Sequence, residues 1–449
     1  MSKQRTKRQK AIIKRRIFVT LCALILISAI ALITFCISAI IKPSENKQNT
    51  DSDISSGQTS DNSSEAEIPE TTATVLSTGD IMVHSTQLTG AKTADGYDFT
   101  AFFKESAPYF QAADLAIANL EVTFGGSESG AYSGYPAFNT PDSLADAIKA
   151  SGLNLLLTSN NHSYDTGLYG LKRTVQILKQ KGIDFTGTKE TETDPTYVVK
   201  EINGIKIGIA NFTYETDGQI AGRKYLNGAI ISEEANPLIN SFSYKRLDEF
   251  YSNVQSILSG MESDGADFKV FYIHWGNEYQ FSPSTWQKSI AQNLSNFGVN
   301  MIIGSHPHVV QPVELIHSED GQNTTVCLYS TGNYVSNQRQ ELMSPECTTG
   351  HTEDGVFFTF TLTKNKDGTD LTGLDLIPTW VDKYKGGENG GYLYTVYPLE
   401  SPDDATSKYS LSQTAAEKAK KSYERTKEIV AAGLTECQQS IGCEITFEQ

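Results

Sequence analysis

The chain has 449 residues, 39% of them hydrophobic and 20% charged, so it can bury a core and is not disordered throughout. Its formal net charge is −16, but residues 1–16 carry eight basic side chains and no acidic one, which leaves −24 on the other 433 residues. Because a body of that charge repels a phosphate backbone over most of its surface, we exclude nonspecific nucleic-acid binding.

The first predicted element is an uncharged run at residues 17–41. As a helix rising 1.5 Å per residue it is about 37 Å long, enough to cross a hydrocarbon layer of about 30 Å. The competing interpretation is a cleavable signal peptide, but its apolar region would be about 7–15 residues long and followed by a small-x-small site. We therefore predict an uncleaved single-pass membrane anchor, with the basic segment 1–16 in the cytoplasm and the chain after Lys42 outside the cell.

Residues 42–71 are rich in Ser, Asp, Asn, Glu, Gln and Thr and contain few apolar side chains. Such a segment cannot bury enough apolar surface to fold, so we predict a disordered extracellular stalk. Folded sequence is predicted from Thr72 onward, as one domain over 72–400 and a C-terminal helical extension over 401–449.

Four of the six cysteines lie in the predicted exterior, where disulfides persist: Cys327, Cys347, Cys437 and Cys443. The bridges Cys437–Cys443 and Cys327–Cys347 and a set of four free thiols all agree with the sequence, because spacing does not determine pairing.

Beyond Thr74, short apolar runs alternate with amphipathic segments. The predicted strands lie within 74–80, 114–121, 153–162, 205–211, 269–274 and 299–304, and the predicted helices are 141–151, 168–181 and 285–297. Gly182 is the expected C-terminal cap of the second helix. This alternation predicts an α/β fold with largely parallel pairing.

The later part of the chain follows a different pattern. The runs 325–329 and 356–362 are expected in a more antiparallel part of the sheets. Residues 410–434 predict a further helix, rich in Ala, Lys and Glu, which packs on the flank of the domain or recruits a partner helix.

Side chains that bind metal ions follow the C-terminal ends of the predicted strands: Asp80, Glu121, Asn161, His162, His274, His306 and His308. In parallel α/β sheets that edge is where ligands bind. Turns also favour Asp and Asn, which accounts for one such residue more easily than for five strand ends. Carboxylate, amide and imidazole without thiolate suit Mn, Fe or Zn, and one or two divalent ions are expected at this edge.

The two histidines of the stretch 302–311 are separated by Pro307. Proline favours extended backbone before it, which would place His306 and His308 on the same side of the chain. Taken alone, such a pair is more often two surface histidines on a loop. His162 lies next to Asn161, so one of them can bind an ion while the other faces a substrate as a general acid. Asp165 would orient His162 or cap the following helix.

Six motifs, in order along residues 72–399, resemble those of the capsule synthesis protein family CapA, which is associated with poly-gamma-glutamate and belongs to the calcineurin-like metallophosphatase superfamily. They are Ser-Thr-Gly-Asp-Ile-Met at 77–82, Ala-Asn-Leu-Glu at 118–121, Ser-Asn-Asn-His-Ser-Tyr-Asp-Thr-Gly at 159–167, Ile-His-Trp-Gly-Asn-Glu-Tyr at 273–279, Gly-Ser-His-Pro-His-Val-Val-Gln at 304–311 and Ser-Thr-Gly-Asn-Tyr at 330–334.

The resemblance implies a metallophosphatase-like four-layer sandwich of two mixed β-sheets flanked by helices. It implies one set of metal ligands, Asp80, Glu121 in place of a bridging aspartate, Asn161, His274, His306 and His308, and a catalytic pair, His162 with Asp165. The chain departs from the superfamily pattern twice. His84 stands four residues after Asp80 instead of two, and Asn119-Leu-Glu121 replaces a Gly-Asp.

The function implied by the resemblance is a membrane-anchored extracellular component of poly-gamma-glutamate capsule synthesis or export, with the polymer and membrane synthase subunits as partners. A body at −24 needs a bound cation or a local basic groove to hold that polyanion. The alternatives are a metal-dependent phosphoesterase or other hydrolase acting on an envelope substrate, and a non-catalytic scaffold.

Overall fold

The computed structural model describes residues 70–218, 220 and 222–447. The predictions for the cytoplasmic segment, the membrane anchor and almost all of the stalk lie outside these residues. Among the helices that are described, none combines the length and the apolar composition needed to cross a membrane.

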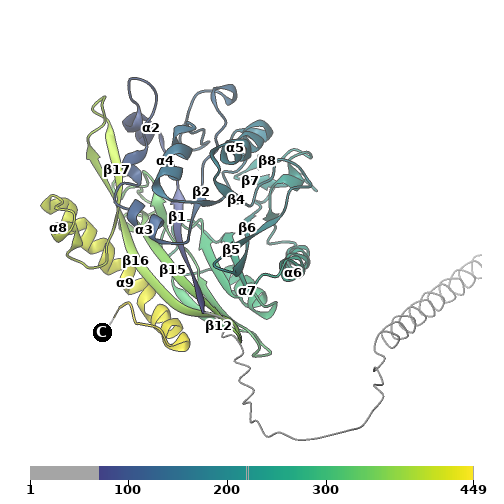
Figure 1. Cartoon of the computed structure of the whole chain (residues 1–449). Helices are drawn as coiled ribbons and strands as arrows, with labels where there is room; N and C mark the ends of the chain where they lie inside the picture. The colour runs from purple at the N-terminus through teal and green to yellow at the C-terminus, as the bar shows by residue number, and fades with distance from the viewer. Residues whose placement is uncertain (1–69, 219, 221, 448–449) are drawn as a thin grey trace, which may run out of the picture. The chain divides into compact units, whose positions relative to one another are not determined.

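Two mixed β-sheets organise the described chain (Figure 1). The first runs in the order β17-β16-β15-β1-β2-β3-β4, and β14 also pairs with β1. Its strands are β1 (Thr71–Ile81), β2 (Leu115–Leu120), β3 (Leu155–Leu157), β4 (Asp184–Thr186), β14 (Asn333–Val335), β15 (Asp354–Asn365), β16 (Gly368–Lys385) and β17 (Tyr392–Pro398). Strands β1 to β4 are parallel, and β15 to β17 continue the sheet in antiparallel fashion.

The second sheet runs in the order β12-β13-β11-β10-β6-β5, with β9 pairing β6. Its strands are β5 (Tyr197–Ile202), β6 (Ile205–Tyr214), β9 (Ser241–Phe242), β10 (Phe268–His274), β11 (Met301–Ser305), β12 (Val313–His317) and β13 (Thr324–Leu328). The central four are parallel, and the edge strands β5 and β12 are antiparallel. A short hairpin joins β7 (Tyr225–Leu226) to β8 (Ala229–Ile230).

Successive side chains of the strands alternate between two apolar layers, as their two-residue repeat requires. In β2, Leu115 and Ile117 belong to the core between the sheets, whereas Ala116 and Ala118 face the helices outside. Strand β10 divides its side chains in the same way. Both sheets are thus buried on both faces, which gives the order helices, sheet, sheet, helices.

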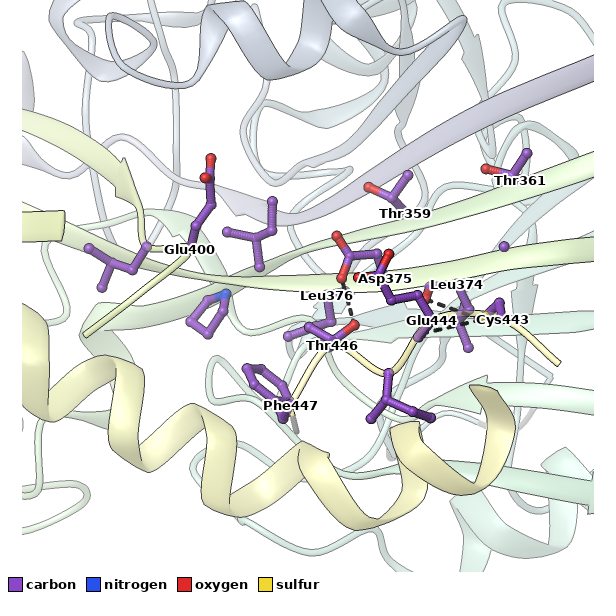
Figure 2. A pocket seen from close by; sticks show the side chains of 15 residues that line it. Thr359, Thr361, Leu374, Asp375, Leu376, Glu400, Cys443, Glu444, Thr446 and Phe447 are labelled. Carbon is purple, nitrogen blue, oxygen red and sulfur yellow. Dashed lines mark hydrogen bonds between the residues drawn. The ribbon is translucent and has the colours of Figure 1, made fainter. Parts of the chain in front are cut away.

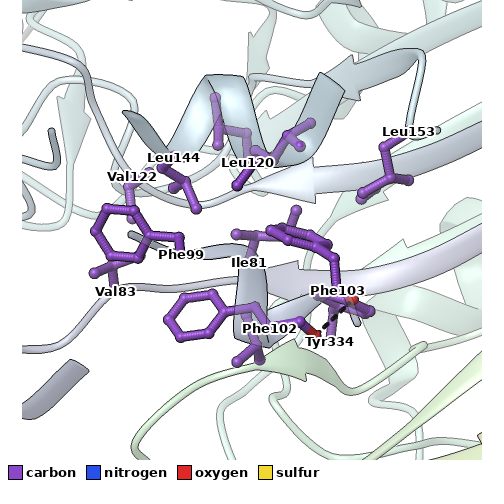
Figure 3. Packing of buried hydrophobic residues seen from close by; sticks show 14 of the residues in the cluster. Ile81, Val83, Phe99, Phe102, Phe103, Leu120, Val122, Leu144, Leu153 and Tyr334 are labelled. Carbon is purple, nitrogen blue, oxygen red and sulfur yellow. Dashed lines mark hydrogen bonds between the residues drawn. The ribbon is translucent and has the colours of Figure 1, made fainter. Parts of the chain in front are cut away.

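Helices α2 (Ser85–Ala91), α3 (Ala107–Ala112), α4 (Ser143–Ser151) and α5 (Gly167–Lys181) cover the outer face of the first sheet. In Figure 3, Phe99, Phe102 and Phe103 pack against Ile81, and the hydroxyl of Tyr334 donates to the Phe102 carbonyl at 3.1 Å. Burying each such side chain stabilises the fold by about 1.5–3 kcal/mol. Helices α6 (Leu247–Ser263) and α7 (Thr285–Asn296) cover the outer face of the second sheet.

The C-terminal helix α9 (Gln413–Ile441) follows the short α8 (Asp404–Ser407) and packs on β16 and β12. Its Val430 and Leu434 enter the core between the sheets. A Cβ atom at Gly433 would lie 1.8 Å from the Val313 carbonyl oxygen, so only glycine permits this close approach. The helix therefore packs on its own domain, the first of the two alternatives.

The segment that follows α9 returns along β16 and borders a pocket of about 510 Å³ (Figure 2). There Thr446 Oγ1 donates to Asp375 Oδ1 at 2.6 Å, and Gln438 Nε2 donates to the Leu374 carbonyl at 2.8 Å. These contacts attach the C-terminal segment to the first sheet.

The predicted α/β fold with two mixed sheets and flanking helices is confirmed. Gly182 ends α5 in the left-handed conformation (φ 64°), as expected. The last helix continues to Ile441, beyond the predicted end at 434, because Gly442 supplies its left-handed cap (φ 73°). Helix α6 and strands β16 and β17 were not predicted. The four described cysteines are free thiols, so neither disulfide is formed.

Candidate metal centre

The parallel strands of the two sheets end at one common rim. Asp80 is the penultimate residue of β1, and His274 is the last residue of β10. The loops after β2, β3 and β11 supply Glu121, Asn161 with His162, and His306 with His308. All of these side chains are at most 3% exposed. The structure thus brings together every predicted ligand, from five strand ends of two different sheets.

Glu121 occupies the middle of this cluster. Its Oε1 lies 3.6 Å from His274 Nε2 and 3.7 Å from His308 Nε2, and it has no hydrogen-bond partner in the described chain. A buried carboxylate oxygen without a partner costs several kcal/mol unless a cation lies against it. The cluster therefore fits a positively charged ligand.

Two groups of side chains have ligand atoms within 4.8 Å of one another. One is Glu121 with His306 and His308, and the other is Asp80, Glu121 and His274. Because Glu121 belongs to both groups, it is the side chain that two ions held here would share. Asn161 Oδ1 lies 2.9 Å from His274 Nε2, at the border of the second group.

Burial sets the protonation of these side chains. It lowers the pKa of His274 and of His306 well below the usual value, so both rings are neutral and offer a lone pair. Burial, with the charges of Asp80 and Glu278, raises the pKa of Glu121 well above its usual value. A bound cation favours the ionised carboxylate and reverses that preference.

Asn119 is a residue of this centre whose role was not predicted. Its Nδ2 donates to Asp80 Oδ1 at 2.8 Å and to Glu121 Oε2 at 3.1 Å, so one amide connects the two carboxylates. Its own Oδ1 accepts from Asn160 Nδ2 at 3.2 Å, which determines the direction in which the amide points. The available signal was its place two residues before Glu121, in the Asn-Leu-Glu variant of the motif.

His162 lies beside the ligand cluster, with Asp165 behind it. The two are joined by a hydrogen bond of 2.8 Å between Nδ1 and Oδ2. Asp165 also accepts from the Phe138 amide at 2.7 Å, and helix α5 has Thr166 at its N-cap. Asp165 therefore orients His162 instead of capping the helix. With Nδ1 held as the donor, the Nε2 atom of His162 is left to accept or donate a proton.

The backbone at the histidine pair differs from the expectation. His306 and His308 have φ of 95° and 56°, so the predicted extended conformation is wrong. Pro307 restricts the residue before it only through steric contact, and the loop gains hydrogen bonds that favour another path. The Tyr279 amide donates to the Pro307 carbonyl at 2.8 Å. Positive φ at a non-glycine residue costs about 1–3 kcal/mol. In this conformation both rings still reach the centre.

Two further side chains line the centre without joining either ligand group. His84, the residue that departs from the motif spacing, packs against Phe138 with ring centroids 5.3 Å apart, and burial lowers its pKa to about 4. Asn333 Oδ1 lies 3.1 Å from His308 Nδ1, and the Asn333 amide donates to Gln338 Oε1 at 2.9 Å. Asn333 thus holds the ring of a candidate ligand.

Comparison with known families gives one match. The model of the family described as "Bacterial capsule synthesis protein PGA_cap" matches residues 74–338, which is more than half of the chain and includes every residue of the candidate centre.

The proteins that resemble the chain include two capsule biosynthesis proteins and one phosphatase of known structure. The PGA biosynthesis protein CapA of Bacillus subtilis (strain 168) is 27% identical over 66% of this chain and 70% of its own length. The capsule biosynthesis protein CapA of Bacillus anthracis is 28% identical over 59% of this chain and 60% of its own length, less than two thirds of that protein. The crystal structure of a phosphatase from Mycoplasma pneumoniae covers 69% of this chain and 94% of its own, with 13% identity and a TM-score of 0.38. At that TM-score the structural likeness carries no weight.

Proposed function

The chain belongs to the bacterial capsule synthesis protein PGA_cap family, and from this premise we propose that it acts in poly-gamma-glutamate capsule synthesis or export through a divalent metal centre. The observation that carries the proposal is Glu121, a buried carboxylate with an unpartnered oxygen that is shared by two ligand groups. Asp80, Glu121, Asn161, His274, His306 and His308 would hold Mn, Fe or Zn. The body would be a sandwich of the metallophosphatase kind.

The proposed location is the outer face of the cell membrane. Its support is the uncharged run 17–41, preceded by eight basic residues. A reporter fused after residue 449 that is active only outside the cytoplasm tests this orientation. Activity of a reporter that works only in the cytoplasm would contradict it.

A divalent ion bound here supplies Lewis-acid polarisation of a phosphoryl or carbonyl oxygen. The protein's own contribution is a proton at His162 Nε2, in the orientation set by Asp165. Asn119 keeps the two carboxylates in place, and the neutral His274 and His306 rings contribute no charge that would repel an ion.

The test is polymer production in cells that carry this protein as the single copy of its gene. The double change His306→Ala and His308→Ala is expected to abolish capsular polymer. His317→Ala, which removes an exposed imidazole on β12, is the matched control and is expected to have no effect. Normal polymer output from the double variant would favour the non-catalytic scaffold.

A second candidate function is phosphoester hydrolysis, which the His162–Asp165 pair beside the cluster favours. The full-length chain, purified in detergent and supplied with Mn, is expected to hydrolyse an aryl phosphate. Loss of a general acid typically costs about 10²–10⁴ in rate, so His162→Ala would reduce turnover by that factor. Absence of turnover by the unmodified chain would exclude this candidate.

A further inference from the structure

A groove of about 670 Å³ opens beside the candidate metal centre, with His306 in its wall. Three aromatic side chains from different elements also line it: Tyr214 at the end of β6, Tyr244 after β9, and Trp286 in the first turn of α7. Trp286 is 50% exposed, an unusual state for the largest apolar side chain beside a buried polar site. The groove therefore has an apolar surface with no partner inside the described chain.

The aromatic rings form a series in which each contacts the next. The ring centroids are 4.8 Å apart for His306 and Tyr214, 6.2 Å for Tyr214 and Tyr244, and 5.8 Å for Tyr244 and Trp286. A cation site encloses one charge between ring faces, whereas a series leading outward matches a ligand with successive flat units. The series begins at the candidate metal centre and ends in solvent.

The rings are held in place independently of any ligand. Tyr244 Oη accepts from the Gly276 amide at 3.0 Å. Trp286 follows Ser284, whose capping box with Gln287 determines how α7 begins. Burial raises the pKa of Tyr244 to about 12, so its ring is neutral at physiological pH. The surface is therefore preformed and uncharged, which reduces the entropic cost of binding.

The charged side chains that line the groove disfavour a polyanion. Its charged lining residues are three acids, Glu215, Asp217 and Glu278, and one base, Lys245. Lys245 pairs with Asp217 at 2.8 Å, and the other two lining acids have no lysine or arginine within the lining. Successive carboxylates of polyglutamate, or phosphates of a polyphosphodiester, would be repelled here.

The lining acid that has no ion pair is suited to accept hydrogen bonds from neutral donors. Glu215 is neutralised by Arg246 at 2.9 Å, which leaves Glu278 as the lining acid without an ion pair among the described residues. Glu278 and Asn277 are exposed at the mouth of the groove and can take hydroxyl or amide groups. An apolar stacking surface edged by such groups matches a sugar ring, which has C–H groups on its faces and hydroxyls around its edge.

We propose that this groove binds an uncharged glycan of the cell envelope, whose rings stack on Tyr214, Tyr244 and Trp286 and whose end reaches the metal centre. The capsular polymer would not occupy it. The inference rests on the proposed function in taking the cluster around His306 as the reacting site and the outer face of the membrane as the location. Stacking of the rings depends on the groove alone.

Fluorescence gives a direct test, because the chain has three tryptophans and two of them, Trp275 and Trp380, are fully buried. Quenching by acrylamide in the full-length chain therefore reports on Trp286. Saturating N-acetylglucosamine tetramer is expected to reduce that quenching at least twofold. A γ-glutamate tetramer and tetramethylammonium are expected to leave it unchanged. Protection by either of these, or none by the glycan, would overturn the proposal.

Calorimetric titration of variants assigns the effect to the ring. Trp286→Ala is expected to weaken glycan binding at least tenfold, and Trp286→Phe to retain most of it. The control Tyr169→Ala removes an exposed aromatic side chain on α5 and should change nothing. Equal glycan affinity in Trp286→Ala and the unmodified chain would contradict the proposal.

Metal content separates this inference from the proposed function. Trp286→Ala is expected to keep its bound metal. Glu121→Gln, which changes no lining residue of the groove, is expected to lose metal while glycan affinity changes less than threefold. Glycan binding by a chain that holds no metal would leave the groove assignment standing and remove the metal function. Metal binding without glycan binding would remove the groove assignment and leave the metal function standing.

Discussion

Two pairs of buried acids in this protein are neutralised in different ways. Glu353 and Asp354, adjacent at the start of β15, each have an arginine of their own. Arg339 Nη2 donates to Glu353 Oε2 at 2.7 Å, and Arg425 of α9 donates to both oxygens of Asp354 at 2.7 and 2.9 Å. This pair of acids is neutralised by the protein itself.

The other pair, Asp80 and Glu121, lies at the rim. Asn119 gives each carboxylate one hydrogen bond, and no Lys or Arg of residues 70–218, 220 and 222–447 forms an ion pair with either. One oxygen of Glu121 has no hydrogen-bond partner among the residues that the structure describes. Burial alone therefore does not identify a functional acid. The absence of a matching cation within the fold does, because it leaves room for an ion from outside.

The largest expected effect is at the neutralised pair. Arg425→Ala leaves Asp354 buried without its partner and should lower the free energy of unfolding by about 3–5 kcal/mol, measured by urea denaturation. Lys420 lies on α9 with Arg425 and forms an exposed ion pair with Asp403 at the start of α8. Lys420→Ala should cost less than about 1 kcal/mol.

The Arg425→Ala loss should depend on pH with a definite sign. Burial raises the pKa of Asp354 from 3.8 to about 6 in the fold. A folded pKa above the unfolded one stabilises the fold fully below the unfolded value, and that contribution is lost as pH rises through about 6. Arg425 favours the ionised form of Asp354, so its removal raises this pKa further. The loss in the variant should therefore be greater at pH 7.5 than at pH 5. An equal loss at both pH values would contradict this.

At the rim, substitution of a buried charged residue is expected to raise the free energy of unfolding instead of lowering it. Burial raises the pKa of Glu121, so the metal-free fold disfavours the ionised form of this acid, which costs stability that glutamine does not. Glu121→Gln should therefore raise the unfolding free energy of the metal-free chain by about 1–3 kcal/mol. Excess Mn should stabilise the unmodified chain by about 2.7 kcal/mol at 100 times its dissociation constant, and the variant not at all. Destabilisation of the metal-free variant would remove the contrast between the two pairs.

A smaller effect is expected on the pH dependence of metal affinity. Binding of an ion must displace the proton that the raised pKa of Glu121 retains, whereas His274 and His306 are already neutral. Metal affinity should therefore rise as pH rises, because less proton has to be displaced from Glu121. Calorimetry in two buffers of different ionisation enthalpy measures the released proton directly. Affinity that is independent of pH would show that Glu121 is already ionised.

The strand ends were predictable because each polar ligand directly follows an apolar run, and the carboxyl ends of parallel strands share an edge. The role of Asn119 was not, because it depends on the register that places Asp80 opposite Asn119 in neighbouring strands. Pairing between strands is non-local, and neither strand's sequence encodes it alone. The left-handed backbone of His306 and His308 was equally hidden, since it follows from hydrogen bonds to a distant loop.

Helix α6 was missed although its signal was present. Phe250, Val254, Ile257, Leu258 and Met261 recur at helical spacing, and all five are buried. The prediction of two sheets did not come from a pattern in the sequence. It came from the family resemblance, because an alternation of strands and helices is compatible with one sheet as well as two.

The metal content of the purified full-length chain tests the central claim most directly. Elemental analysis after loading with Mn, Fe or Zn and removal of unbound ions is expected to find about one to two divalent ions per chain. That content should fall to background in Glu121→Gln and stay unchanged in His317→Ala. A chain that retains no ion under any of these conditions, or a Glu121→Gln variant that retains as much as the unmodified protein, would contradict the account.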